Sequence, residues 1–140
     1  MLAGKAALGI GGAQIQDADR LLAKARTRLA AKELFIAKFY ADRHAWGAVR
    51  GRTEDLVRTY PDTPRVPDAL ALWGVALHRW GRVNEADQVR AQLAERSPDS
   101  GPLHRLDHEL ARPAGTPPDE KIFVRPYKIR GVSPVTGQPY

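Results

Sequence analysis

The segment ELFIAKFYADRHAWGAVRGRTEDLVRTYPDTP, residues 33–64, sets the pattern that the following part of the chain repeats. It is typical of two helices that are joined by a tight turn at His44 and ended by Pro61, because proline interrupts a helix. The first helix is expected to start upstream and to cover 14–43, since that range lacks proline and glycine and is rich in strong helix formers. It is expected as one long helix or as two nearly collinear ones with a joint near residues 30–32. The second helix is expected over 46–60.

A second, more divergent copy of this helix pair follows 37 residues later. Gly81 then stands where the first copy has His44. Helices are expected over 67–80 and 83–96, with Gly81 as the C-terminal cap of the former. A single helical hairpin cannot bury its own apolar face, so units of this kind stack and share a core.

The spacing within the second copy is that of the tetratricopeptide repeat, which is about 34 residues long. The residues that match this spacing are Gly74, Gly81, Val83, Ala86 and Pro98. The sequence therefore predicts an all-α, tetratricopeptide-like helical-hairpin solenoid of four to five helices with an extended C-terminal tail. The positions expected in its shared core are Tyr40, Trp46, Leu56, Trp73, Gly74, Leu77, Gly81 and Ala86.

The long first helix has more apolar surface than one neighbouring helix would cover. The stripe that we expect to face the core comprises Leu22, Ala25, Leu29, Ile36 and Tyr40, at steps of three, four and seven residues. Leu34, Phe35 and Phe39 widen this surface, so the helix is expected to have neighbours on more than one side. In the later helices, Gly51 is expected to permit close helix approach and Val83 to face inward.

Composition divides the chain into three parts. We expect a flexible lead-in over 1–13, a repeat domain over 14–110, and a proline-rich extended tail over 111–140. The two repeats within the domain are expected at about 30–63 and 67–100.

The tail holds six of the eleven prolines of the chain. It is expected to follow a short capping helix over 102–110. Within it, 121–125 alternates in the manner of a strand, but we expect an extended segment that lies on the solenoid or on a partner.

The absence of cysteine excludes disulfides, thiolate zinc sites and cysteine nucleophiles. No apolar run approaches the roughly 18 residues of a membrane-spanning helix. The start, MLAGKAALGIGGA, is too short and too rich in glycine for a secretory signal, and no lipid-accepting cysteine follows it. We therefore expect no export address in the chain as written.

The net charge of +6 is compatible with several kinds of binding partner. Binding of nucleic acid would call for clustered positive charge beside aromatic or helix-turn-helix features. An acidic protein partner or anionic lipid headgroups would also suit a basic scaffold. Arginines here are mostly interleaved with acids, as in residues 52–55, which favours solvated helix faces.

A longer pattern resembles the family of the outer-membrane assembly lipoprotein BamD. Its members carry a pattern like R-L-A-x-H/K-E-x-x-V/I-A-x-F/Y-Y-x-x-R-x-A-W/Y, followed by a helix that ends in Y-P-D-T. The matching residues here are Arg28, Leu29, Ala30, Glu33, Ile36, Ala37, Phe39, Tyr40, Arg43, Ala45, Trp46 and Tyr60, Pro61, Asp62, Thr63. The resemblance covers about residues 17–100.

The resemblance implies a non-enzymatic scaffold at the periplasmic face of the outer membrane. Family members bind the POTRA domains of the BamA barrel, assemble with other lipoproteins of that complex, and help receive unfolded outer-membrane proteins. By position, Arg52 corresponds to the family arginine that faces an acidic POTRA surface, with Glu54 and Arg58 on neighbouring faces. Members have a signal peptide, a lipidated cysteine and about five repeats, so we expect this chain to correspond to the last two.

Other candidate sites have simpler interpretations. Trp80, at a helix end before Gly81, is expected to be partly exposed and to serve as a contact. Glu33 is expected at the edge of the inner stripe, paired with a neighbouring arginine or lysine, and no partner base or nucleophile for catalysis is evident. His104 and His108 have the i, i+4 spacing of metal ligands but lack a third ligand, so neither a metal nor a cofactor is expected.

Two further functional hypotheses remain beside the resemblance. The chain can be another scaffold of the cell envelope or of a large complex, whose C-terminal tail docks on a partner. A weaker alternative is a basic nucleic-acid-binding module, although we expect no nucleic acid among the partners.

Overall fold

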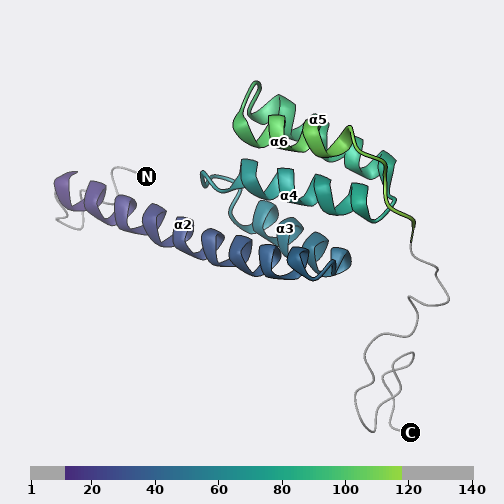
Figure 1. Cartoon of the computed structure of the whole chain (residues 1–140). Coiled ribbons are helices and arrows are strands. Elements are labelled where there is room, and N and C mark those ends of the chain that lie inside the picture. Colours follow the sequence, from purple (N-terminus) through teal and green to yellow (C-terminus); the bar gives the residue numbers. More distant parts are fainter. Residues whose placement is uncertain (1–11, 118–140) are drawn as a thin grey trace, which may run out of the picture.

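A computed structural model describes residues 12–117, which are helical with short connections. Its helices, labelled in Figure 1, are α2 (Gly12–Asp42), α3 (Trp46–Thr59), α4 (Val66–Arg79), α5 (Val83–Arg96) and α6 (Gly101–Leu110). Consecutive helices run antiparallel and stack side by side, and α6 returns against α4 (Figure 1). The predicted all-α, tetratricopeptide-like fold is therefore confirmed. The lead-in before Gly12 and the strand-like stretch 121–125 lie outside the described residues.

Helix α4 is the centre of the structure, because it contacts each of the other four described helices. Its sequence, VPDALALWGVALHR, has alanine, leucine, valine or tryptophan on every side of the helix. Its buried residues are Val66, Ala69, Leu70, Ala71, Gly74, Ala76, Leu77 and His78. A helix that is hydrophobic all round must be covered all round, which explains its central position.

The first helix of each hairpin ends with the same C-terminal capping conformation. Gly81 has a φ of +77° and His44 a φ of +56°, so both lie in the left-handed region. After α4, the amide of Arg82 donates to the carbonyl of Leu77 at 2.8 Å, and after α2 the amide of Ala45 donates to the carbonyl of Tyr40 at 3.0 Å. This bonding is the Schellman motif, and it explains why the two sequence copies align at an offset of 37.

The Tyr60–Thr63 turn that joins the hairpins is held from two sides. Arg26 of α2 donates to the carbonyl of Thr59 at 3.0 Å and to Asp62 Oδ1 at 2.7 Å. The hydrogen bond from Arg26 is the main reason why the pKa of Asp62 is lowered. From the other side, Arg96 of α5 donates to the carbonyl of Pro61. The YPDT sequence thus fixes the relative position of three helices.

Three expectations about faces are wrong. In α2, which is one continuous helix, Leu22 and Leu29 of the expected inner stripe are 61% and 49% exposed. The residues buried in that helix are Ala30, Leu34 and Ala37. Two of these are alanines, whose small side chains let α3 approach closely. Gly51 is exposed with open space where a Cβ would lie, and Val83, the first residue of α5, is 42% exposed.

The chain after α6 turns back over the C-terminal end of α4. His78 Nε2 donates to the carbonyl of Arg112 at 2.7 Å, and the amide of Gly115 donates to the carbonyl of His78 at 3.0 Å. A Cβ on Gly115 would lie 1.6 Å from the carbonyl oxygen of Arg79, so only glycine fits there. None of the helices within residues 12–117 combines the length and the apolar character needed to cross a membrane.

Candidate partner-binding site

Arg52 lies at the edge of α3 that faces α2. Its Nη1 donates to Glu33 Oε2 of α2 at 3.2 Å, and the two side chains are 42% and 26% exposed. The expectation that Glu33 pairs with a neighbouring arginine or lysine is confirmed. A guanidinium has five N–H donors in a planar fork, so the pair with Glu33 leaves Arg52 able to contact a second carboxylate.

The other arginines of this region point in different directions and have partners of their own. Arg58 pairs with Asp55 on the solvent side of α3. Arg50 reaches α5, where its guanidinium lies 3.3 Å from Glu85. The structure therefore separates these arginines from Arg52 and does not gather them into one basic patch. Glu54 is exposed on α3.

Trp80 follows the last residue of α4 and is half-buried. The guanidinium of Arg82 lies over its ring, 4.2 Å from the centroid, and the indole packs against the hydrophobic core. Trp80 therefore has an intramolecular role in the turn between α4 and α5.

The expected core positions differ in depth. Leu56, Gly74, Leu77 and Ala86 are buried, whereas Tyr40, Trp46, Trp73 and Gly81 are half-buried. Trp46 is stacked on His44, with ring centroids 5.2 Å apart and an interplanar angle of 15°. A Cβ on Gly74 would come within 2.7 Å of Leu106 Cδ1, so this glycine sets the distance between α4 and α6.

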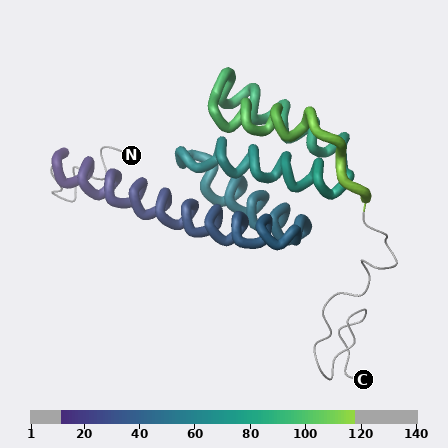
Figure 2. Tube along the Cα trace, in the orientation of Figure 1, coloured from purple at the N-terminus to yellow at the C-terminus, as the bar shows by residue number. Residues whose placement is uncertain are grey.

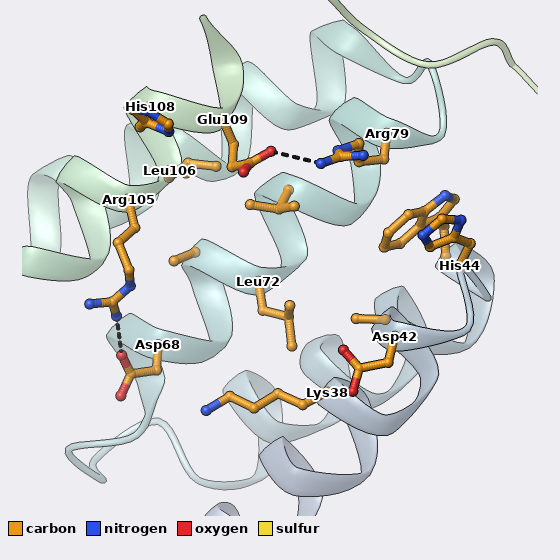
Figure 3. A pocket seen from close by; sticks show the side chains of 14 residues that line it. Lys38, Asp42, His44, Asp68, Leu72, Arg79, Arg105, Leu106, His108 and Glu109 are labelled. Carbon is orange, nitrogen blue, oxygen red and sulfur yellow. Dashed lines mark hydrogen bonds and ion pairs between the residues drawn. The ribbon is translucent and has the colours of Figure 1, made fainter. Parts of the chain in front are cut away.

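A cleft of about 640 Å³ opens between the C-terminal end of α2, α4 and α6 (Figure 3). Leu72 of α4 points into it, and Val75 and Leu106 add apolar wall. Two ion pairs cross from α4 to α6 along its rim. Arg79 Nη2 lies 3.2 Å from Glu109 Oε2, and Arg105 Nη2 lies 2.8 Å from Asp68 Oδ1.

The opposite wall of the cleft carries Lys38 and Asp42 of α2 and His44 of the turn that follows (Figure 3). Trp46, the first residue of α3, also lines the cleft. A groove with an apolar floor and charged walls can hold an extended peptide. Sequence reasoning missed this cleft, because its lining comes from residues 38–46, 68–79 and 105–109, which no single periodic pattern connects.

The two histidines with metal-ligand spacing lie in different surroundings. His104 Nε2 lies 2.8 Å from Asp99 Oδ1, and His108 lies in the wall of the cleft. No group of three potential ligands gathers anywhere within residues 12–117.

Residues 13–93 match the family model described as "YfiO: Outer membrane lipoprotein". The chain is also similar to proteins named outer membrane protein assembly factor BamD. The one from Xylella fastidiosa strain Temecula1 is 35% identical over 83 residues, which are 59% of this chain and 28% of that protein. The one from Haemophilus influenzae strain Rd is 42% identical over 66 residues, 47% of this chain and 25% of that protein.

The protein of the same name from Vibrio cholerae is 34% identical over 83 residues, which are 59% of this chain and 34% of that protein. The matches thus span about a quarter to a third of the length of these curated relatives. No solved structure matches the chain significantly.

Proposed function

Because this chain belongs to the YfiO family of outer membrane lipoproteins, we propose that it is a non-enzymatic scaffold of outer-membrane protein assembly. Its relatives are named assembly factors of the outer membrane, which supports a place at the periplasmic face of that membrane. The partners that we propose are POTRA-type domains of a BamA-like barrel and other lipoproteins of the assembly complex.

The ion pair between Arg52 and Glu33 is the observation that carries this proposal. A guanidinium that is already ordered loses little entropy when an acidic surface binds it. Glu33 orders Arg52 in this way and leaves its side chain 42% exposed. A half-exposed pair of this kind is worth only about 0.2–1 kcal/mol, so a partner's carboxylates can share or replace Glu33. Glu54 and Arg58 are proposed to flank this contact from the solvent side of α3.

The cleft between α2, α4 and α6 supports a second part of the same role. Its apolar floor at Leu72 and Val75 and its charged rim suit an extended, unfolded segment. We infer that unfolded outer-membrane proteins contact the scaffold there, while POTRA-type domains contact the Arg52 edge.

Co-purification with purified POTRA domains tests the proposal through Arg52→Glu. We expect the variant to lose binding at least about tenfold, because it places like charges against an acidic surface. Arg20→Glu, which makes the same charge change at an exposed site on α2, is the matched control and should bind normally. The swap Glu33→Arg with Arg52→Glu restores the internal pair but leaves residue 52 negative, so it should also fail to bind.

Recovery of binding by the swap would show that Arg52 acts through the pair and not on the partner. Normal binding by Arg52→Glu alone would refute the contact. A folded wild-type chain that binds no POTRA domain would refute the scaffold role itself.

A further inference from the structure

The chain after α6 leads to one end of the cleft between α2, α4 and α6. It crosses the C-terminal end of α4 (Figure 2), where His78 Nε2 donates to the carbonyl of Arg112. A Cβ on Gly81 would collide with the backbone of Pro117, so the last described residue lies against the turn that follows α4. Arg79, two residues before Gly81, lines the cleft. The tail beyond Pro117 therefore starts beside the opening of the cleft.

The position of Pro117 gives the tail a short route into the cleft. Residues 118–120 can span at most about 11 Å, at up to 3.6 Å per residue. The cleft extends along α4 from Asp68 to Arg79, which is about 16 Å at 1.5 Å per residue. Five extended residues cover about the same distance at 3.3 Å each. Residues 121–125, which we call the KIFVR segment, therefore have the length that fills the cleft.

The alternation of the KIFVR segment suits the lining of the cleft. Side chains of an extended segment alternate between two sides, so Lys121, Phe123 and Arg125 share one side. Leu72 points into the cleft (Figure 3), and Val75 adds to its apolar floor. A phenylalanine buries about 150–250 Å² when it is enclosed, which makes Phe123 the anchor of the segment.

One carboxylate in the wall of the cleft is available for a cation. Asp42 is exposed and forms no ion pair among residues 12–117, whereas the other two acids of the lining pair with arginines across the rim. Helices α2 and α4 run in the same direction, so Asp42 lies at the end where the tail enters (Figure 1). Lys38, a cation of the same wall, lies one helical turn farther from this end. Lys121, the first residue of the KIFVR segment, therefore comes to Asp42 first.

We propose that the KIFVR segment occupies the cleft of its own chain, antiparallel to α4, with Phe123 on the apolar floor and Lys121 beside Asp42. A short connection gives a tethered segment a local concentration on the order of millimolar, so even a weak contact is populated. The tail then competes with other extended segments for the cleft. This consequence rests on the proposed role of the cleft in binding unfolded outer-membrane proteins.

Disulfide trapping in the full 140-residue chain tests the proposal, because the chain has no cysteine of its own. The trapping pair is Lys38→Cys with Val124→Cys, which leaves Phe123 and Asp42 in place. Mild oxidation at low protein concentration, followed by non-reducing electrophoresis, measures how fast the monomeric disulfide forms.

The control pair is Val83→Cys with Val124→Cys. Val83 follows Gly81 by two residues, so it lies beside the point where the tail starts, but it does not line the cleft. Lys38 and Val83 are both exposed, so circular dichroism should show an unchanged fold in both pairs.

We expect the trapping pair to form its disulfide at least about tenfold faster than the control pair, since the bound segment holds Val124 near α2. Phe123→Ser should lower the rate of the trapping pair to that of the control. Asp42→Lys should also slow it, and Lys121→Asp added to that change should restore the rate, because the exchange recreates an ion pair.

Equal rates for the two pairs would overturn the proposal, and so would trapping that Phe123→Ser leaves unchanged. Disulfide-linked dimers in place of monomers would also overturn it, because the tail of a second copy would then occupy the cleft.

A labelled synthetic peptide that copies one β-strand of an outer-membrane barrel tests the competition separately. By fluorescence anisotropy, the trapped chain should bind this peptide about tenfold more weakly than the same chain after reduction, and Phe123→Ser should bind it more tightly than wild type. Equal binding by the trapped and reduced chains would refute the competition. Successful trapping in a chain that binds no peptide, even with Phe123→Ser, would refute the proposed role of the cleft but not its occupation by the tail.

Discussion

The close contact of α4 with α6 predicts opposite effects for two glycine-to-alanine substitutions. Gly74 and Gly51 both lie inside helices, where alanine is favoured over glycine by about 0.8–1.0 kcal/mol. No atom outside its own helix lies within 4 Å of a Cβ placed on Gly51, so Gly51→Ala should stabilise the fold by roughly that amount.

Gly74→Ala meets a different surrounding. Its new Cβ would lie 2.7 Å and 2.9 Å from the two δ-carbons of Leu106, which is fully buried and cannot swing into solvent. Overpacking of this kind costs about 1–3 kcal/mol, which outweighs or cancels the gain in helix propensity. The net change should lie between about 0 and 2 kcal/mol of destabilisation, and the two variants should differ by about 1–3 kcal/mol.

Urea unfolding followed by circular dichroism at 222 nm measures both free energies of unfolding. Leu106→Ala provides the decisive background, because it removes both clashing carbons. The single change should cost about 2–5 kcal/mol, and Gly74→Ala added to it should now stabilise. If Gly74→Ala stabilises the wild-type chain as much as Gly51→Ala does, α4 and α6 are not packed in this way and the reasoning is refuted.

Two further predictions concern the C-terminal part of the fold. The hydrogen bond from Arg90 lowers the pKa of Asp107 below its ordinary 3.8. The ion pair therefore stabilises the packing of α5 on α6 above pH 3.8. This stabilisation is lost as the pH falls through the lowered pKa of Asp107 in the folded state. Asp107→Asn should therefore melt a few degrees below wild type at pH 7. The gap should shrink progressively as the pH of the melts is lowered below 3.8, and a gap independent of pH would contradict the assignment. Gly115→Ala should release the segment that lies over α4, because the new Cβ would collide with the carbonyl of Arg79. Hydrogen exchange should then accelerate at the amide of residue 115, while the free energy of unfolding changes little. Unchanged protection of that amide would contradict the close approach.

The ends of the helices are the features that sequence reasoning found most accurately. The predicted 83–96 helix is observed as Val83–Arg96, and the predicted 46–60 helix as Trp46–Thr59. Gly81 is predicted as a cap, and its φ of +77° and Schellman bonding confirm this. Such signals act over at most five residues along the chain, because they depend on backbone conformation and local hydrogen bonds.

The choice of the buried face of α2 could not be predicted in the same way. That helix carries Leu22 and Leu29 on one side and Ala30 and Leu34 on the other, so its periodicity offers two faces. Helix α3 packs on the side of α2 where alanine permits close approach. The hydrophobic periodicity of α2 could not predict this choice, because it carries no information about α3. The larger side chains were consequently left exposed.

Local sequence signals thus predicted where helices begin and end, how the two copies align, and which family the chain resembles. The tertiary structure decided which face of α2 is buried, that Arg52 pairs with Glu33, and that α2, α4 and α6 enclose a cleft. The physical reason is range. Capping and helix propensity are decided within a few residues, whereas a buried face, an ion pair across 19 residues and a cleft between three helices exist only once distant segments have packed.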